Sequence, residues 1–253
     1  MAQYDERALV LDVTQYRESS LLVRVLTEHE GRISLVARGI RKANAGSGAA
    51  ALQPFHLVKL RFALKDGANM GNLISADLER AATAPHGSIE AYALVSYWFE
   101  ILKVTSLERA AMGGVFDLTM RMLDGQRQQA GLNLHYLRNL MELWRRLGFG
   151  ISWERCLICD RSVMELPSPL FFSISRGGVV CDDCQQKENL ATMRLTDKEK
   201  EVVKFLEAAS GSAGNFTTSD LLSILGVLNR FLVNHLEQPL RTFSFVNNVM
   251  GHH

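Results

Sequence analysis

The four cysteines of the chain form two Cys-x-x-Cys pairs, Cys156 with Cys159 and Cys181 with Cys184. Thiolates at this spacing can bind one metal ion from a tight turn, and two such turns supply the tetrahedral geometry that Zn²⁺ prefers. The number of residues between the two pairs is close to that of known zinc sites. The alternative interpretation is four unrelated thiols or two disulfides. Four cysteine ligands leave no open coordination position, so we expect one structural Zn²⁺ per chain and no chemistry at the metal.

The residues around the pairs predict a small module with two strands. Phe171–Ile174 is strand-like, Gly177 and Gly178 indicate a tight turn, and Val179-Val180 leads into the second pair. This is the layout of a zinc ribbon. We exclude His252 and His253 as ligands, because a terminal histidine pair is typical of a purification tag.

Short apolar runs separated by turn residues fill the first 80 residues. The runs are Ala8–Leu11, Leu21–Leu26, Ile33–Ala37, Leu57–Phe62 and Leu73–Ala76. Strands of this length, so closely spaced, predict a small barrel or sandwich.

Basic residues are concentrated in the middle of this segment. The stretch from Gly31 to Lys65 contains no acidic residue, although the net charge of the whole chain is only +1. We interpret its cations as a phosphate-binding track whose affinity comes from counterion release: Arg32, Arg38, Arg41, Lys42, Lys59 and Arg61. The alternative is a solvated face whose acids come from other strands. Aromatic candidates for base stacking are few, namely Tyr16, Phe55, His56 and Phe62.

Helical periodicity replaces the strands from about residue 88. Tyr92–Leu102 is apolar nearly all round, which indicates a buried helix. Val115–Leu123 and Leu134–Trp144 precede the cysteine module. After it, a capping box at Thr196–Glu199 begins one helix and Thr217–Asp220 caps another. The sequence thus predicts an α+β protein with segments 1–80, 81–150, 151–190 and 191–250, the third being the four-cysteine zinc module inserted among helices.

Composition and motifs narrow the function classes. The chain is 47% hydrophobic and 22% charged, which is typical of a globular protein. It has no G-x-x-x-x-G-K-[ST], H-E-x-x-H or G-x-S-x-G motif, so we do not expect an enzyme. A polar start at Met1–Glu6 and the lack of long apolar runs predict a protein without a secretory signal or membrane contact. Metal-type cysteine spacing without such a signal predicts a cytoplasmic protein.

The assembled pattern resembles the RecO family of bacterial recombination mediators. The resemblance rests on the order of short motifs around the four cysteines: Ala8–Leu11, Glu18–Leu22, Ala37–Arg41, Leu52–Phe55, Leu147–Phe149 and Gly177–Cys181. It implies an OB-fold barrel followed by one helical domain that contains the zinc module. It further implies binding of single- and double-stranded DNA, strand annealing, and cooperation with RecR and single-strand-binding protein (SSB) to load RecA in recombinational repair of DNA damage.

The resemblance also implies a dock for the acidic C-terminal tail of SSB, which requires an apolar groove rimmed by cations. Lys204, Arg230 and Arg241 supply the charge, and the stripe of Leu221, Leu225, Leu228 and Leu232 supplies the apolar surface unless it is core. Two other hypotheses stay open: a zinc-ribbon adaptor that binds proteins without DNA, and an enzyme acting on nucleic acid. Steep salt dependence of DNA binding separates the mediator from the adaptor.

Overall fold

The computed structural model describes residues 2–18, 20–38, 50–68, 70–81, 88–105, 114–188, 190–207 and 215–251. The chain divides into two compact units. Met1–Ser88 and Trp98–Arg127 form the first, and Ile89–Tyr97 and Gln128–His253 form the second. The segment boundaries expected near residues 80, 150 and 190 stay a prediction; the structure groups part of the early helices with the strands.

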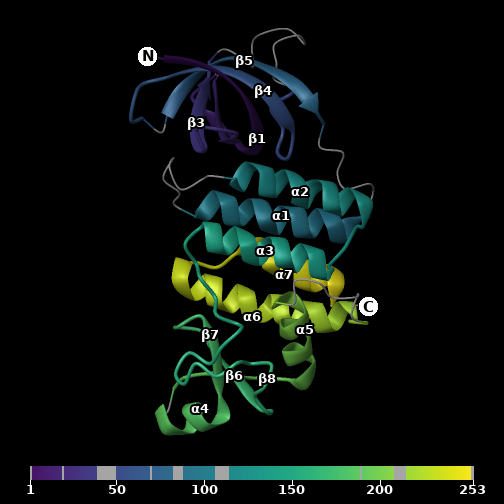
Figure 1. Cartoon of the computed structure of the whole chain (residues 1–253). Coiled ribbons are helices and arrows are strands. Elements are labelled where there is room, and N and C mark those ends of the chain that lie inside the picture. Colours follow the sequence, from purple (N-terminus) through teal and green to yellow (C-terminus); the bar gives the residue numbers. More distant parts are fainter. Residues whose placement is uncertain are drawn as a thin grey trace. The chain divides into compact units, whose positions relative to one another are not determined.

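Five strands close into a barrel in the order β1-β2-β3-β5-β4 (Figure 1). The strands are β1 (Ala2–Tyr16), β2 (Ser20–Thr27), β3 (Arg32–Ala37), β4 (Leu57–Leu64) and β5 (Met70–Arg80). The long β1 pairs with β4 through its first half and with β2 through its second, and its register shifts between Val10 and Asp12. Such a shift bends a strand, which allows one strand to serve both neighbours and close the sheet.

Alternation of apolar and polar residues fills the barrel and decides what lies outside it. On β4 the side chains of Val58, Leu60 and Phe62 are fully buried, while Lys59 and Arg61 between them are exposed. The ring of Tyr4 on β1 stacks on Phe62 with centroids 5.1 Å apart. Each of the five expected runs lies in a strand, and the barrel, not the sandwich, is confirmed.

Two helices complete the first unit, α2 (Val115–Gln128) and the second half of α1 (Ile89–Val104). The indole N–H of Trp98 donates to the Thr119 hydroxyl at 3.1 Å, which joins the two helices. The ring of Phe99 meets Phe55 edge to face at 4.8 Å. The first unit is therefore a barrel whose core extends onto helices.

The second unit is mainly helical and contains α3 (Leu134–Arg146), α5 (Asp197–Glu207), α6 (Thr218–Leu236) and α7 (Arg241–Met250). Both expected caps are present. Thr196 and Glu199 exchange hydrogen bonds of 2.7 and 3.1 Å, and Thr217 forms a capping box with Asp220 at the start of α6. Caps of this kind satisfy backbone N–H groups that have no partner within the helix.

The module inserted in this unit is a three-stranded sheet with one short helix. Its elements are β6 (Leu170–Ser173), β7 (Gly178–Cys181), α4 (Asp182–Glu188) and β8 (Met193–Leu195). Strand β6 lies in the centre and pairs antiparallel with both β7 and β8. The sequence predicted β6 and β7 but neither α4 nor β8.

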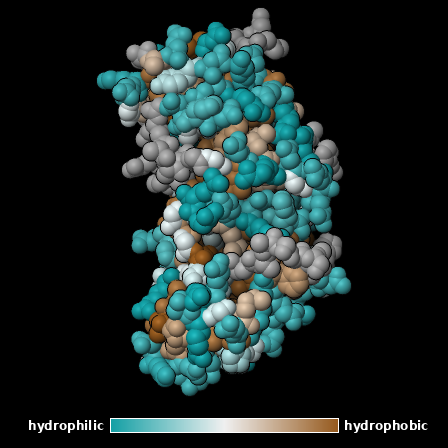
Figure 2. Space-filling view, in the orientation of Figure 1, coloured by the Kyte–Doolittle hydropathy of each residue, from teal (hydrophilic) through white to brown (hydrophobic). Residues whose placement is uncertain are grey.

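Hydrophilic residues cover most of the face of the barrel that Figure 2 shows, whereas hydrophobic residues reach the surface in the module. Met164 of the module, for example, is 61% exposed. Among the helices that the structure describes, none is both long and apolar enough to cross a membrane.

The barrel leaves no room for a side chain at Gly71 on β5. A Cβ atom there would lie 2.6 Å from the Ala63 carbonyl oxygen and 3.1–3.2 Å from side-chain atoms of Leu64 and Leu35. We expect Gly71→Ala to lower the free energy of unfolding by about 1–3 kcal/mol, the usual cost of overpacking. Gly226 on α6 has open space around it, so Gly226→Ala should raise stability by up to about 1 kcal/mol. Urea unfolding of both variants checks this, and a Gly71→Ala variant as stable as wild type would contradict it.

Candidate metal centre and nucleic-acid interface

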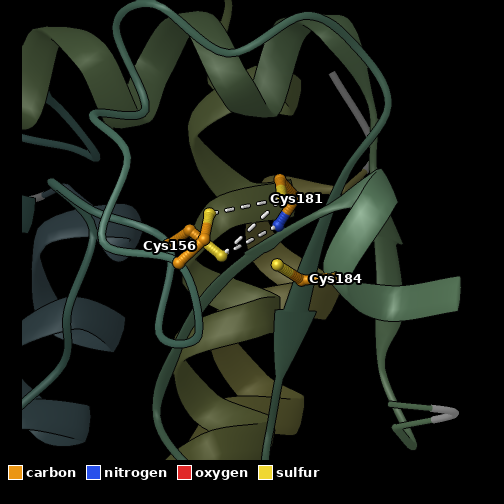
Figure 3. Close-up of side chains that lie close together, drawn as sticks. Cys156, Cys181 and Cys184 are labelled. Carbon is orange, nitrogen blue, oxygen red and sulfur yellow. Dashed lines mark hydrogen bonds between the residues drawn. The ribbon is translucent and has the colours of Figure 1, made fainter. Parts of the chain in front are cut away.

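The four cysteines converge in the module. Their Sγ atoms all lie within 4.8 Å of one another, and Figure 3 shows those of Cys156, Cys181 and Cys184 turned toward each other. Three of the cysteines are buried, while Cys159 is exposed. The structure thus brings together the full set of expected ligands, close enough to hold one metal ion.

The sulfur spacing fits a tetrahedral metal site and does not fit disulfides. The Sγ of Cys181 lies 3.8 Å from the Sγ atoms of both Cys156 and Cys159. Metal–sulfur bonds of about 2.3 Å in a regular tetrahedron place the sulfurs about 3.8 Å apart, whereas a disulfide requires about 2.05 Å. All four residues are free cysteines.

The first pair is held by a hydrogen-bonded turn against β7. The backbone N–H of Asp160 donates to the Cys156 carbonyl at 3.0 Å, and that of Leu157 donates to the Val179 carbonyl at 2.9 Å. The Leu157 side chain then lies over Gly178, where a Cβ would be 2.7 Å from it. Glycine at position 178 is therefore needed for the turn to approach the strand.

The second pair lies where β7 passes into α4. Cys181 is the last residue of β7, and Cys184 lies in the first turn of α4. The Cys181 backbone N–H donates to the Cys156 sulfur at 3.4 Å, which links the two pairs directly. A strand end followed at once by a helix start turns both thiols to the same side.

The thiols of the cluster differ in their ease of ionisation. Hydrogen bonds from Arg161 lower the pKa of Cys159 to about 6. Burial raises the pKa of Cys184 to about 12, and the hydrogen bond between its thiol and Cys181 adds to this by favouring the protonated form. A bound metal ion would override this difference, because a coordinating thiol is deprotonated outright.

A chain of aromatic rings joins the module to the helices of the second unit. Trp153, just before the first pair, stacks on Phe172 of β6 with centroids 4.7 Å apart. Phe172 meets Phe231 of α6 edge to face at 6.3 Å, and Phe231 lies 6.1 Å from Trp144 of α3. Through these ring contacts, packing around the cysteine cluster is coupled to packing in the helical core.

The basic residues expected on the nucleic-acid track have different environments. Lys59 and Arg61 form exposed ion pairs with Asp5 of β1, at 3.4 and 3.6 Å. The Arg32 guanidinium donates to the carbonyls of Leu102 and Lys103 at the end of α1, at 3.3 and 2.6 Å. Asp5 thus supplies Lys59 and Arg61 with an acid from another strand, the arrangement that the alternative interpretation describes, whereas the partners of Arg32 are backbone carbonyls of a helix.

Arg38, by contrast, is exposed and lines a cavity of about 550 Å³ at one end of the barrel. Its walls also include Tyr16, Arg17, Met70 and Asn72. Arg17, at a positive φ of 58°, lies over the Tyr16 ring at 5.4 Å. Sequence reasoning missed Arg17, because it lies outside the basic run; the turn between two expected strands was the available signal. Arg41 and Lys42 lie outside the described residues.

Comparisons with known proteins agree with this architecture. A family model described as "Recombination protein O N terminal" matches residues 1–82, and one described as "Recombination protein O C terminal" matches residues 86–242. The chain belongs to the RecO family.

Relatives named DNA repair protein RecO cover most of the chain. The one from Syntrophomonas wolfei subsp. wolfei is 30% identical over 213 residues, which are 77% of this chain and 78% of the relative. The one from Streptomyces griseus subsp. griseus is 25% identical over 260 residues, 97% of this chain and 99% of the relative. The one from Pelotomaculum thermopropionicum is 27% identical over 258 residues, 98% and 94% respectively.

Two of the four aromatic residues considered for base stacking in this RecO-family barrel are buried. Phe62 is fully buried, and His56 is 8% exposed with Nδ1 3.0 Å from the Ala51 carbonyl oxygen. Phe55 packs on Phe99. The expectation was therefore wrong for Phe62 and His56, and Tyr16 in the cavity is the best placed of the four.

The leucine stripe of α6 is core and not the floor of a groove. Leu221 is 4% exposed, and Leu225, Leu228 and Leu232 are fully buried. The expectation that these leucines supply the apolar surface of the dock was therefore wrong. Arg230 nevertheless lines a cavity of about 520 Å³ with Met193, Leu222 and Phe243. Arg241 is exposed, and the Lys204 ammonium donates to the Met164 carbonyl of the module at 3.4 Å.

Proposed function

We propose that this protein is a DNA-binding mediator without enzymatic activity, which anneals complementary single strands and, with RecR, helps RecA load onto SSB-coated DNA. Membership of the RecO family supports a role in DNA repair and recombination. The proposal also rests on the family resemblance for its finer parts. These are strand annealing, the partners RecR, SSB and RecA, and a cytoplasmic, nucleoid-associated location.

The observation that most supports DNA binding is the barrel cavity with Arg17, Arg38 and Tyr16. Two exposed guanidinium groups at the mouth of a closed barrel suit phosphate contacts, and a tyrosine ring beside them suits stacking on one base. We include Arg41 and Lys42 in the interface, because they follow Arg38 closely in sequence. Arg32, Lys59 and Arg61 take a secondary part, since each has a protein partner.

Annealing requires two strands to approach despite the repulsion of their phosphates. Cations on the protein reduce this repulsion without reading the bases, because phosphate contacts carry no direct sequence information. Few stacking residues favour a loose complex, from which paired strands can leave.

Replacing Arg17 and Arg38 together by glutamine should weaken binding of single strands of any sequence. The slope of log K against log salt should fall by about 0.7 for each phosphate group that the variant no longer binds. The pair Lys59→Gln and Arg61→Gln removes the same charge and is the matched control; its slope should change less, because Asp5 already offsets part of the charge of these two cations. Fluorescence anisotropy across salt concentrations measures the slopes, and annealing of bare and SSB-coated strands tests the function. Equal slopes in the Arg17/Arg38 variant and wild type, with unchanged annealing, would sink the proposal.

We further propose that the metal held by Cys156, Cys159, Cys181 and Cys184 is one structural Zn²⁺ per chain. An all-thiolate set favours zinc among the common divalent ions, and four protein ligands exclude a catalytic water. Zinc would thus fix the module and, through the aromatic chain, the helices beside it.

Metal analysis of protein purified without chelator should find one zinc per chain. Cys159→Ser should lose most of that zinc and lower the melting temperature of the second unit, because binding energy at such sites is folding energy. Ser162→Ala changes the same turn without touching a sulfur and should keep its zinc. A wild-type protein with far less than one zinc per chain would rule out the site as proposed.

For the SSB tail we propose the cavity lined by Arg230, with Arg241 and Lys204 as additional cations. Met193, Leu222 and Phe243 supply apolar walls that replace the buried leucines. The cavity also has polar walls, including Glu199, and Arg230 is the cation that lines it. An acidic peptide that ends in an apolar residue suits its combination of an arginine with apolar walls.

Titration of the acidic tail peptide should show weaker binding to the Arg230→Ala, Arg241→Ala variant by roughly 2- to 30-fold, or about 0.2–1 kcal/mol for each exposed charge pair. Arg145→Ala is the comparison variant, because Arg145 lines a different cavity of about 550 Å³ beside Trp144 and Trp153. If only Arg145→Ala weakens peptide binding, the dock is the cavity beside Arg145 and not the one beside Arg230. If the peptide binds neither wild type nor variant, the chain has no such dock.

One observation favours a protein-binding adaptor as the second candidate. The ion pairs of Lys59 and Arg61 with Asp5 show that part of the basic run is neutralised on the barrel surface. If the remaining cations bind no DNA, the zinc module and the cavity on α6 become the functional surfaces. The salt-dependent binding experiment distinguishes the two candidates.

A further inference from the structure

One cation lies directly against the sulfur cluster. The Nε of Arg161 donates to the Cys159 sulfur at 3.3 Å, and its Nη2 donates to the Cys181 sulfur at 3.4 Å. The same Nη2 donates to a carboxylate oxygen of Asp183 at 2.7 Å. A single guanidinium therefore bridges one ligand from each cysteine pair and is anchored by a residue of α4.

The geometry of these contacts suits arginine in particular. Its planar fork presents several N–H donors in fixed directions and keeps its charge at any ordinary pH. Donors that point at two sulfurs at once favour thiolates, because charge-assisted hydrogen bonds are the strong ones. Four thiolates around one divalent ion carry a net negative charge, which a neighbouring cation partly offsets.

An ordinary surface ion pair does not explain the arrangement. Arg155 provides the comparison within the module: its Nη1 lies 2.8 Å from the Asp160 carboxylate and 2.6 Å from the Asp160 carbonyl. Both arginines are about half exposed, at 56% for Arg155 and 50% for Arg161. Exposed pairs of this kind contribute little by themselves, but the structure gives only Arg161 among these two a hydrogen bond to sulfur.

We propose that Arg161 is a positioning residue of the metal centre, which stabilises the bound ion by donating to two ligand thiolates and covers Cys159, the exposed ligand. This inference rests on the metal site proposed above. Asp183 orients the guanidinium, so that it faces the sulfurs and not solvent. Groups that hydrogen-bond to metal ligands in this way fix ligand orientation and tune the electronic properties of the metal.

Two effects follow for a protein that lacks the guanidinium. Affinity for the metal should fall about 10- to 100-fold, the usual range when a hydrogen-bond partner of a ligand is removed. The ligand sulfurs should also become more electron-rich and more accessible. In cobalt-loaded protein the thiolate-to-cobalt charge-transfer bands should therefore move to lower energy, and alkylation of Cys159 by iodoacetamide should become faster.

The test uses the full chain in four forms: wild type, Arg161→Gln, Arg161→Lys and the control Arg155→Gln. Zinc affinity is measured by competition with a chromophoric chelator, cobalt spectra are recorded at saturation, and Cys159 alkylation is followed by mass spectrometry. We expect Arg161→Gln to show all three effects, Arg161→Lys to recover affinity in part through its charge, and Arg155→Gln to match wild type. Circular dichroism of the metal-saturated forms shows whether each variant is folded.

Each outcome decides the inference. Equal affinity, spectra and alkylation in Arg161→Gln and Arg155→Gln would overturn the role of Arg161 and leave the metal site standing. Equal losses in both variants would assign the effect to surface charge in general and would also overturn it. Wild-type protein that binds neither zinc nor cobalt would remove the site and this inference together.

Discussion

Four sulfur atoms that lie within 4.8 Å of one another are the constraint around which the module of the second unit is built, and they are close enough to hold one metal ion. Thiolates this close repel each other in a partly buried setting, and uncharged thiols make only weak contacts. The chain nevertheless uses a tight turn, a strand end and a helix start to bring them together. Trp153, Phe172 and Phe231 continue from this cluster into α6, so if an ion is bound as proposed, its loss would loosen helical packing as well as the module.

Strand pairing rearranges the charge pattern that the sequence presents. The basic run contains no acid, yet Asp5 stands opposite Arg61 because the first half of β1 pairs with β4. Lys59 and Arg61 point outward for the same reason that Leu60 and Phe62 point inward, namely the two-residue alternation of a strand. Arg38, just after β3, and Arg17, in the turn after β1, lie outside the paired parts of these strands. Both line the cavity.

Local features of the sequence predicted the structure well, and long-range pairing limited the rest. The cysteine pairs, the capping boxes at Thr196 and Thr217 and the strand runs each depend on spacing within a few residues. The partner of Arg61, the third strand β8 and the bend in β1 depend on register between distant segments, which a single sequence does not contain. The leucine stripe of α6 had the right period, but a period cannot tell a buried face from an open groove.

The distribution of aromatic rings determines whether base stacking or phosphate contacts would dominate the proposed DNA binding of the barrel. Tyr4 and Phe62 stack with each other, and Phe55 packs on α1, so these rings contribute to folding energy and not to base stacking. Phosphate contacts would then dominate affinity, and such contacts are similar for every sequence and weaken as salt rises. A single-strand binder with many stacking rings would hold its strand against pairing. A barrel with few of them would release two strands once they had paired, as the annealing function proposed above requires.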